Sequence, residues 1–266
     1  MTTTLDPTTV DRAPTRNSAV SLTRVVGVEL RKMFDTRSGF WLMASIVIVA
    51  LLTMVATVFF APESDLTYYT FARALGFPMT VVLPIIAILS ITGEWSQRTG
   101  LTTFTLVPHR SRVILAKTIS SVVVGAVAML FALAVGVVGN LLGTAIAGTD
   151  LVWDVSLAEG ANIVLGSLLC LLTGTMLGML LRSSAAALVA YFVISFLLPT
   201  LAQLLAAGES WFRDAQPWVD ANLARSYLFE GTLTGEQWAH VAVTVVVWLV
   251  LPALLGLRLA MRSEVK

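Results

Sequence analysis

Residues 92–117 form the polar stretch of this sequence whose residue types and spacing most favour a specific interaction. Glu94 and Arg98 are four residues apart, so their side chains can pair on one face of a helix. Leu101 and Phe104 fall together on a face of the same helix, and a proline four residues later ends it. A short, rigid helix that is held at both ends by membrane spans can transmit force from a soluble partner. The alternative is an ordinary loop that has collected positive charge.

The rest of the sequence offers little that could catalyse a reaction. It contains neither a Gly-x-x-x-x-Gly-Lys-Ser/Thr phosphate-binding loop nor a Gly-x-Ser-x-Gly nucleophile motif. The two histidines, His109 and His240, are far apart, and the single cysteine, Cys170, lies in an apolar run, so we expect no metal site. No charged residue lies deep in an apolar run, which argues against a proton-coupled carrier. We therefore expect that the chain is not an enzyme and binds no cofactor itself.

Six apolar runs predict the fold class, an all-α integral membrane protein. Hydrophobic residues make up 57% of the chain and charged residues 12%, which is about half the charged content of soluble domains, roughly 25%. A helix that crosses a bilayer needs about 20 mainly apolar residues. The runs that we interpret as spans are residues 40–60, 75–92, 118–142, 161–181, 185–206 and 239–257.

The charged residues predict how these spans are oriented. With a cytoplasmic N-terminus, the inner segments 1–39, 93–117, 182–184 and 258–266 contain 14 Lys and Arg against 6 Asp and Glu. The outer segments then contain 3 Lys and Arg against 10 Asp and Glu. Cytoplasmic loops accumulate Lys and Arg during membrane insertion. We therefore expect both termini to lie in the cytoplasm.

Polar segments flank the six-span domain, which we place at residues 40–260. Residues 1–20 predict a disordered cytosolic tail, and residues 261–266 form a short second tail. Residues 21–39 predict an amphipathic helix in the inner headgroup plane, with its cations toward anionic membrane lipid. Packing of this helix on a soluble partner is the alternative. The cations of the interfacial helix are Arg24, Arg31, Lys32 and Arg37.

Prolines and glycines predict where the spans bend and where they approach one another. Proline removes a backbone donor and so favours kinks or breaks. The spans contain prolines at positions 78, 84, 199 and 252. Glycines four residues apart allow close approach of two helices, either within this chain or across a dimer interface. Such pairs are Gly139 with Gly143 and Gly174 with Gly178.

Two segments are unusual in length. Residues 113–147 as one helix would be about 52 Å long, longer than a hydrocarbon core of about 30 Å, so this run protrudes or bends at Gly143. The outer segment 207–237 is polar but rich in aromatic residues, which favour the membrane surface. We expect two short helices there, on or in the outer leaflet. Thr200 and Gln203, near its start, are candidate linings of a substrate path.

The polar stretch resembles part of a known family. Glu94-x3-Arg98-Thr99-Gly100, followed by Leu106-x-Pro108-x2-Ser111-Arg112-x4-Lys117, is similar to the first intracellular loop of ABC-2-type exporter permeases. These are the membrane subunits of bacterial ATP-binding-cassette transporters. Residues 29–37 resemble the interfacial helix of the same family, and the six-span layout is also similar. One departure is visible, because many members read Arg-Gly-Thr where this chain reads Arg98-Thr99-Gly100.

The resemblance implies a permease subunit of an ATP-driven exporter in the bacterial plasma (inner) membrane. Residues 94–104 would be a coupling helix that docks on a separate cytosolic ABC ATPase, and that ATPase would bind ATP and Mg. Spans two and five would line the substrate path at the interface with a second permease copy or a related permease. The coupling residues would be Glu94, Trp95, Arg98, Thr99, Gly100, Leu101 and Phe104.

The substrate that we expect is an amphipathic drug, lipid or peptide, and nucleic acid is not an expected partner. A second hypothesis is a non-transporting immunity or sensory membrane subunit on the same fold, since a fold does not determine function. A third hypothesis is an intramembrane enzyme. That enzyme would need clustered carboxylates or a nucleophile with its base at membrane depth, and the sequence provides neither.

Overall fold

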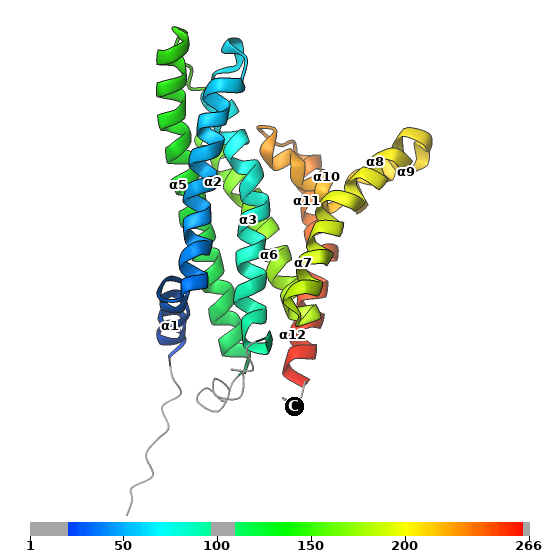
Figure 1. Cartoon of the computed structure of the whole chain (residues 1–266). Helices are drawn as coiled ribbons and strands as arrows, with labels where there is room; N and C mark the ends of the chain where they lie inside the picture. The colour runs from blue at the N-terminus through cyan, green and yellow to red at the C-terminus, as the bar shows by residue number, and fades with distance from the viewer. Residues whose placement is uncertain (1–20, 97–109, 263–266) are drawn as a thin grey trace, which may run out of the picture.

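The computed structural model describes residues 21–96 and 110–262, and every regular element within them is a helix. Six helices in this part of the chain are long and apolar enough to span a membrane, which confirms the all-α membrane fold. Four spans are single helices, and the fifth (184–208) and sixth (235–262) are composite. The single ones are α2 (Arg37–Phe60), α3 (Tyr68–Ser96), α5 (Arg110–Ala147) and α6 (Leu157–Leu181). The chain is therefore a multi-pass membrane protein (Figure 1).

The bundle is organised around α6. In the most apolar stretch of α6, 72% of the residues are buried, against 50% in α3 and only 11% in the fifth span. Because α6 packs along α3, α5 and the sixth span, apolar side chains from several helices surround it. Its C-terminal end turns sharply at Arg182, whose φ of 52° lets the chain reverse into the fifth span. The fifth span leaves most of its surface open to the surroundings.

Glycines allow α6 to lie directly against α3. A Cβ atom on Gly174 would be 2.7 Å from the carbonyl oxygen of Pro84, and one on Gly178 would be 3.1 Å from Ile91. The other predicted pair packs in the same way, because a Cβ on Gly139 would be 2.7 Å from the ring of Phe71. Both glycine pairs therefore serve helix packing within this chain.

The third span is a single helix of 38 residues, about 57 Å long, so it protrudes from a bilayer core and does not break at Gly143. Its connection to α6 folds back on it, because the amide of Asn140 donates a hydrogen bond to the carbonyl of Val152 at 2.9 Å. Ser156 then starts α6 with a reciprocal cap that includes Glu159. A single 3-10 turn, η1 (Glu63–Asp65), joins α2 to α3.

The prolines act differently in the three spans that contain them. α3 includes Pro78 and Pro84 without a break. Before Pro199 and before Pro252, by contrast, each helix widens into a π-helical turn, which confirms the irregularities expected at these two prolines. The fifth span is α7 (Ser184–Phe192), η2 (Val193–Leu197) and α8 (Leu198–Gly208). The sixth span is α11 (Gly235–Val245), η4 (Val246–Val250) and α12 (Leu251–Arg262).

The predicted amphipathic helix is α1 (Leu22–Asp35), and it packs across α5 and against α2. Thr36 ends it and caps α2 by accepting a hydrogen bond from the backbone of Gly39 at 3.0 Å. In Figure 1, α1 and the ends of α3 and α12 lie at the same end of the bundle, which we call the α1 end. The connection that contains η1 lies at the opposite, far end.

The segment between the fifth and sixth spans contains short helices, as expected. They are α9 (Ser210–Val219), α10 (Ala221–Ser226) and the 3-10 turn η3 (Tyr227–Phe229). In Figure 1, α8 and α9 project outward at the upper right, whereas α10 lies back toward the bundle.

Candidate functional site

The predicted coupling residues belong to the α1 end of the bundle as far as the structure describes them. Glu94 and Trp95 lie in the last turn of α3. The remaining residues of that prediction lie outside the described part of the chain: Arg98, Thr99, Gly100, Leu101 and Phe104. The described helices that flank this segment are α3 and α5. A force on the segment would therefore act on these two helices, and its effect depends on their contacts with the rest of the bundle.

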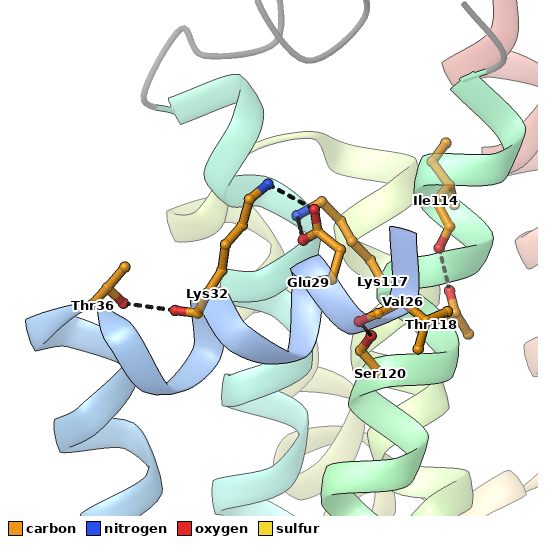
Figure 2. A network of polar contacts seen from close by, with 8 residues as sticks. All are labelled: Val26, Glu29, Lys32, Thr36, Ile114, Lys117, Thr118 and Ser120. Carbon is orange, nitrogen blue, oxygen red and sulfur yellow. Dashed lines mark hydrogen bonds and ion pairs between the residues drawn. The ribbon is translucent and has the colours of Figure 1, made fainter. Parts of the chain in front are cut away.

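Glu29 of α1 connects α1 to the start of α5 (Figure 2). Its two carboxylate oxygens accept hydrogen bonds from Lys32 and Lys117, each at 2.7 Å. Glu29 and Lys117 are buried, with side chains only 5% and 8% exposed, whereas Lys32 is 48% exposed. The hydroxyl of Ser120 adds a hydrogen bond to the carbonyl of Val26 at 3.3 Å. We call Glu29, Lys32 and Lys117 the α1 latch.

The α1 latch keeps its carboxylate charged. Burial alone would raise the pKa of Glu29, because burial disfavours the charged form. The charges and hydrogen bonds of Lys117 and Lys32 outweigh burial, so the pKa of Glu29 lies below its usual value of 4.5. The latch is thus a buried ion pair with a second, exposed cation on the same carboxylate.

The interfacial cations predicted from the sequence divide into two groups. Arg24 and Arg31 lie on α1 and are exposed, as a lipid-facing role would require. Arg37 is also exposed, but α1 ends at Asp35, so Arg37 begins α2 and does not belong to the interfacial helix as predicted. Lys32 instead bonds Glu29. Glu29 was not among the site residues predicted from the sequence, although the sequence contained a signal. Glu29 is four residues from both Val25 and Met33, so it lies within the apolar stripe of α1 and needs a buried partner.

A second polar region lies deeper in the bundle, where α10 enters between the spans. The amide of Asn222 donates a hydrogen bond at 2.8 Å to the carbonyl of Ile194, in the π-helical turn η2. The indole of Trp248, in η4, donates one at 2.8 Å to the carbonyl of Val219. Both π-helical turns are thus contacted by the segment α9–α10. Wide turns of this kind are frequent at functional sites.

Arg225 of α10 is the charged residue that this arrangement buries. It is only 9% exposed, and its guanidinium donates hydrogen bonds to the sulfur of Cys170 at 3.1 Å and to the amide oxygen of Asn222 at 3.2 Å. Cys170 lies near the middle of α6. No charged residue lies deep in an apolar run of the sequence, but the fold buries this one, which comes from the segment between two runs. Because the segment folds back between the spans, it carries a cation from a connecting loop into the bundle.

Arg225 faces two cavities. The polar cavity, of about 400 Å³, has side chains from α3, α6, the fifth span and α10 in its wall. Its polar lining residues include Arg73, Tyr191, Gln203, Arg225 and Glu230. The apolar cavity, of about 360 Å³, lies between α6, the two π-helical turns and α9–α10. Arg225 and Asn222 line both.

The two residues predicted to line a substrate path differ in position. Gln203 lines the polar cavity. Thr200 lines neither cavity, and its hydroxyl bonds the carbonyl of Phe196 in its own helix at 2.9 Å. Tyr191 was not predicted from the sequence as a site residue. Its hydroxyl donates a hydrogen bond to the carbonyl of Thr80 in the wall of the polar cavity.

The described residues contain no group of three or more His, Cys, Asp or Glu side chains that could hold a metal ion. His240 is buried against the ring of Trp218, with ring centroids 4.3 Å apart, and Glu236 is 3.9 Å from it. The other histidine, His109, lies outside the described part of the chain.

No protein-family model matches the chain, and no characterised protein matches it significantly. A function must therefore be argued from the chain's own residues.

Proposed function

We propose that the chain is the membrane subunit of an ATP-driven exporter, moved by a separate cytosolic ATPase that grips residues 94–104. The α1 end of the bundle then faces the cytoplasm, in agreement with the distribution of Lys and Arg along the sequence. In this proposal the chain supplies the substrate path, and the ATPase supplies ATP hydrolysis. The proposal extends the resemblance of the 92–117 segment to ABC-2-type permeases.

The observation that best supports the proposal is the continuity of α3. This helix runs without a break from Glu94 to the wall of the polar cavity, which it lines with Arg73, Phe77 and Thr80. Thr80 is 14 residues from Glu94, about 21 Å along a helix axis. A push on the end of α3 therefore reaches the cavity through one continuous helix.

The α1 latch would give the same push a second effect. It ties α1 to Lys117, within the first turns of α5. The segment 97–109 joins α3 to α5, so a partner that grips it pulls on both helices. Because Glu29 is bonded to α5, α1 moves with them. We infer that α1, α3 and α5, with α6 packed against α3 and α5, move together, and that the Tyr191–Thr80 hydrogen bond passes this motion to the fifth span.

The walls of the polar cavity also favour this proposal over its alternatives. They include side chains from the second and fifth spans, which the family resemblance implies as the substrate path. A second copy, or a related permease, would complete the path on the exposed face of the fifth span. An intramembrane enzyme remains the weaker hypothesis, because the described cavity residues include no clustered carboxylates. A non-transporting subunit would have the coupling segment but would move no substrate.

Co-purification with the ATPase tests the proposal. Tagged wild-type chain, isolated from the membranes of its own host, is expected to retain a cytosolic protein with a phosphate-binding loop. Glu94→Ala and Arg98→Ala should lose this protein while they still insert into the membrane. The control Arg258→Ala changes an exposed cation on α12 and should retain it. Equal recovery of the ATPase with all four chains, or recovery with none, would contradict the proposal.

A further inference from the structure

We propose that the polar cavity binds the anionic head group of a single-chain amphiphile, that the guanidinium of Arg225 is its main ligand, and that the apolar cavity holds its tail. This inference rests on the proposed transport function, for which it specifies the class of substrate. The shared chemistry is a phosphate or carboxylate attached to an apolar chain.

The buried guanidinium of Arg225 has no carboxylate from the described part of the chain beside it to balance its charge. Among the described residues, no carboxylate lies within 4.0 Å of its guanidinium. Its two hydrogen-bond acceptors, Cys170 and Asn222, are formally neutral, and sulfur is a weak acceptor. A guanidinium has five N–H donors, and burial of a cation without a counter-ion is costly. An anionic ligand would remove that cost.

The nearest acidic side chain on the same segment is already used elsewhere. One oxygen of Asp220 caps α10, where it accepts from the backbone of Asn222 at 2.9 Å and of Leu223 at 3.2 Å. Its other oxygen accepts from Gln216 at 3.1 Å. Asp220 therefore attracts Arg225 from a distance but leaves the guanidinium directed at other acceptors.

The other charged residues of the polar cavity leave its lining with a net positive charge. Arg73 of α3 and Glu230 are both exposed and line the same polar cavity. No ion pair within 4.0 Å joins them in the described structure. Two cations and one carboxylate thus give the lining a net positive charge. Arg73 is suited to attract an anion at the opening, and Arg225 to bind it at depth, because planar guanidinium groups match carboxylate and phosphate geometry.

The apolar cavity, which shares Arg225 and Asn222 with the polar cavity, offers space for an apolar tail. Its walls are mainly Leu, Ile, Val and Trp side chains, among them Leu169, Ile194 and Trp248. Arg225 and Asn222 lie in the walls of both cavities, so a head group at Arg225 can have its tail in the apolar one. A free inorganic anion would not use this second space, so an amphiphile fits the pair of cavities better.

Binding to the purified full-length chain in uncharged detergent tests this inference without any ATPase. The probes are four single-chain amphiphiles of equal tail length: a lysophosphatidic acid, a fatty acid, a fatty alcohol and an alkyl trimethylammonium. We expect one or both anions to bind at least tenfold more tightly than the alcohol and the cation. Preference for the phosphate over the carboxylate identifies a phospholipid-type head group, and the reverse preference identifies a fatty acid.

Variants then connect the preference to the cavity. Arg225→Met should weaken anion binding at least tenfold and leave alcohol binding unchanged. Arg225→Lys, which keeps the charge, should retain part of the affinity. Arg73→Met, at the exposed rim, should weaken anion binding about threefold. This variant still tests the inference if Arg225→Met does not fold. Arg258→Met is the distant control.

Equal binding of all four probes, or unchanged anion binding in Arg73→Met and in the folded Arg225 variants, would overturn the inference. The result is separable from the transport proposal. Anion selectivity that depends on Arg225, in a chain that associates with no ATPase, would retain the site and reject the exporter. ATPase association without anion selectivity would do the opposite.

Discussion

The hydroxyl of Tyr191 in the fifth span donates a hydrogen bond to the backbone carbonyl of Thr80 in α3. This carbonyl is four residues before Pro84, which has no N–H to bond it in the helix. Tyr191 is only 1% exposed, and it supplies the donor that the proline lacks. The fifth span is therefore attached to α3 at the wall of the polar cavity, at the position where a proline leaves α3 an open acceptor.

Tyr191→Phe should show the energetic value of this attachment. The variant leaves the buried Thr80 carbonyl without its partner, so we expect the free energy of unfolding to fall by about 1–3 kcal/mol. Tyr227→Phe is the matched control, because no hydrogen bond of its hydroxyl occurs within the described structure, and its effect should be much smaller. The measurement is thermal unfolding of the two variants in the same detergent. Equal losses in the two variants would mean that the Tyr191 bond contributes little.

The two lysines of the α1 latch should differ in their effect on stability. Both bond Glu29 at 2.7 Å, but Lys117 is buried and Lys32 is half-exposed. Loss of one partner of a buried ion pair typically costs about 3–5 kcal/mol, whereas an exposed pair contributes up to about 1 kcal/mol. Lys117→Met should therefore lower the unfolding temperature far more than Lys32→Met. Similar shifts for both would show that α1 is not held by the buried pair.

The contribution of Glu29 should depend on pH in a defined direction. Its pKa in the folded protein lies below the usual 4.5, so the folded state favours the charged form. The stabilisation is therefore complete above about pH 4.5 and is lost as the pH falls through the lower, folded pKa. The difference in unfolding temperature between wild type and Glu29→Gln should be constant from pH 8 to pH 5 and shrink below pH 4.5. A difference that grows on acidification would reverse the assigned sign.

Two glycines of α6 should respond in opposite ways to alanine. A Cβ at Gly174 would be 2.7 Å from the Pro84 carbonyl oxygen, which is backbone and cannot move aside. We expect Gly174→Ala to cost about 1–3 kcal/mol by forcing α3 and α6 apart. Gly160 has no atom within 4 Å of its Cβ position, so Gly160→Ala should be neutral or stabilise the helix by about 0.5–1 kcal/mol. Unfolding of both variants provides the comparison, and a stable Gly174→Ala would contradict the close packing.

The fold was predictable because hydrophobic length and charge distribution are local properties of the sequence. All six spans were located from uninterrupted apolar runs, and Pro199 and Pro252 marked the irregular turns. The glycine pairs in α5 and α6 were recognised, but the sequence alone left open whether they pack within the chain. The partners that decide this, Phe71 and Pro84, lie on another helix.

The polar contacts between helices were not predictable in the same way. Lys117 is 88 residues from Glu29, and Arg225 is 55 residues from Cys170. Only Glu29 left a local signal, since a carboxylate within an apolar stripe requires a buried partner. Arg225 left none, because its burial depends on how the segment that contains α9 and α10 folds back between two spans. An arginine in a polar loop looks the same in sequence whether the loop stays outside or enters the bundle.

In the proposed function, residues 94–104 are the part of this membrane protein that a cytosolic ATPase holds. A photo-crosslinking amino acid at Phe104, in cells of the natural host, tests it most directly, with the same substitution at the exposed Trp153 in the connection between α5 and α6 as the control. We expect position 104 to crosslink to a protein with a phosphate-binding loop and position 153 to form no such crosslink. Absence of any ATPase crosslink at position 104, or access to this position by a membrane-impermeant reagent added outside intact cells, would show that no cytosolic ATPase holds this segment.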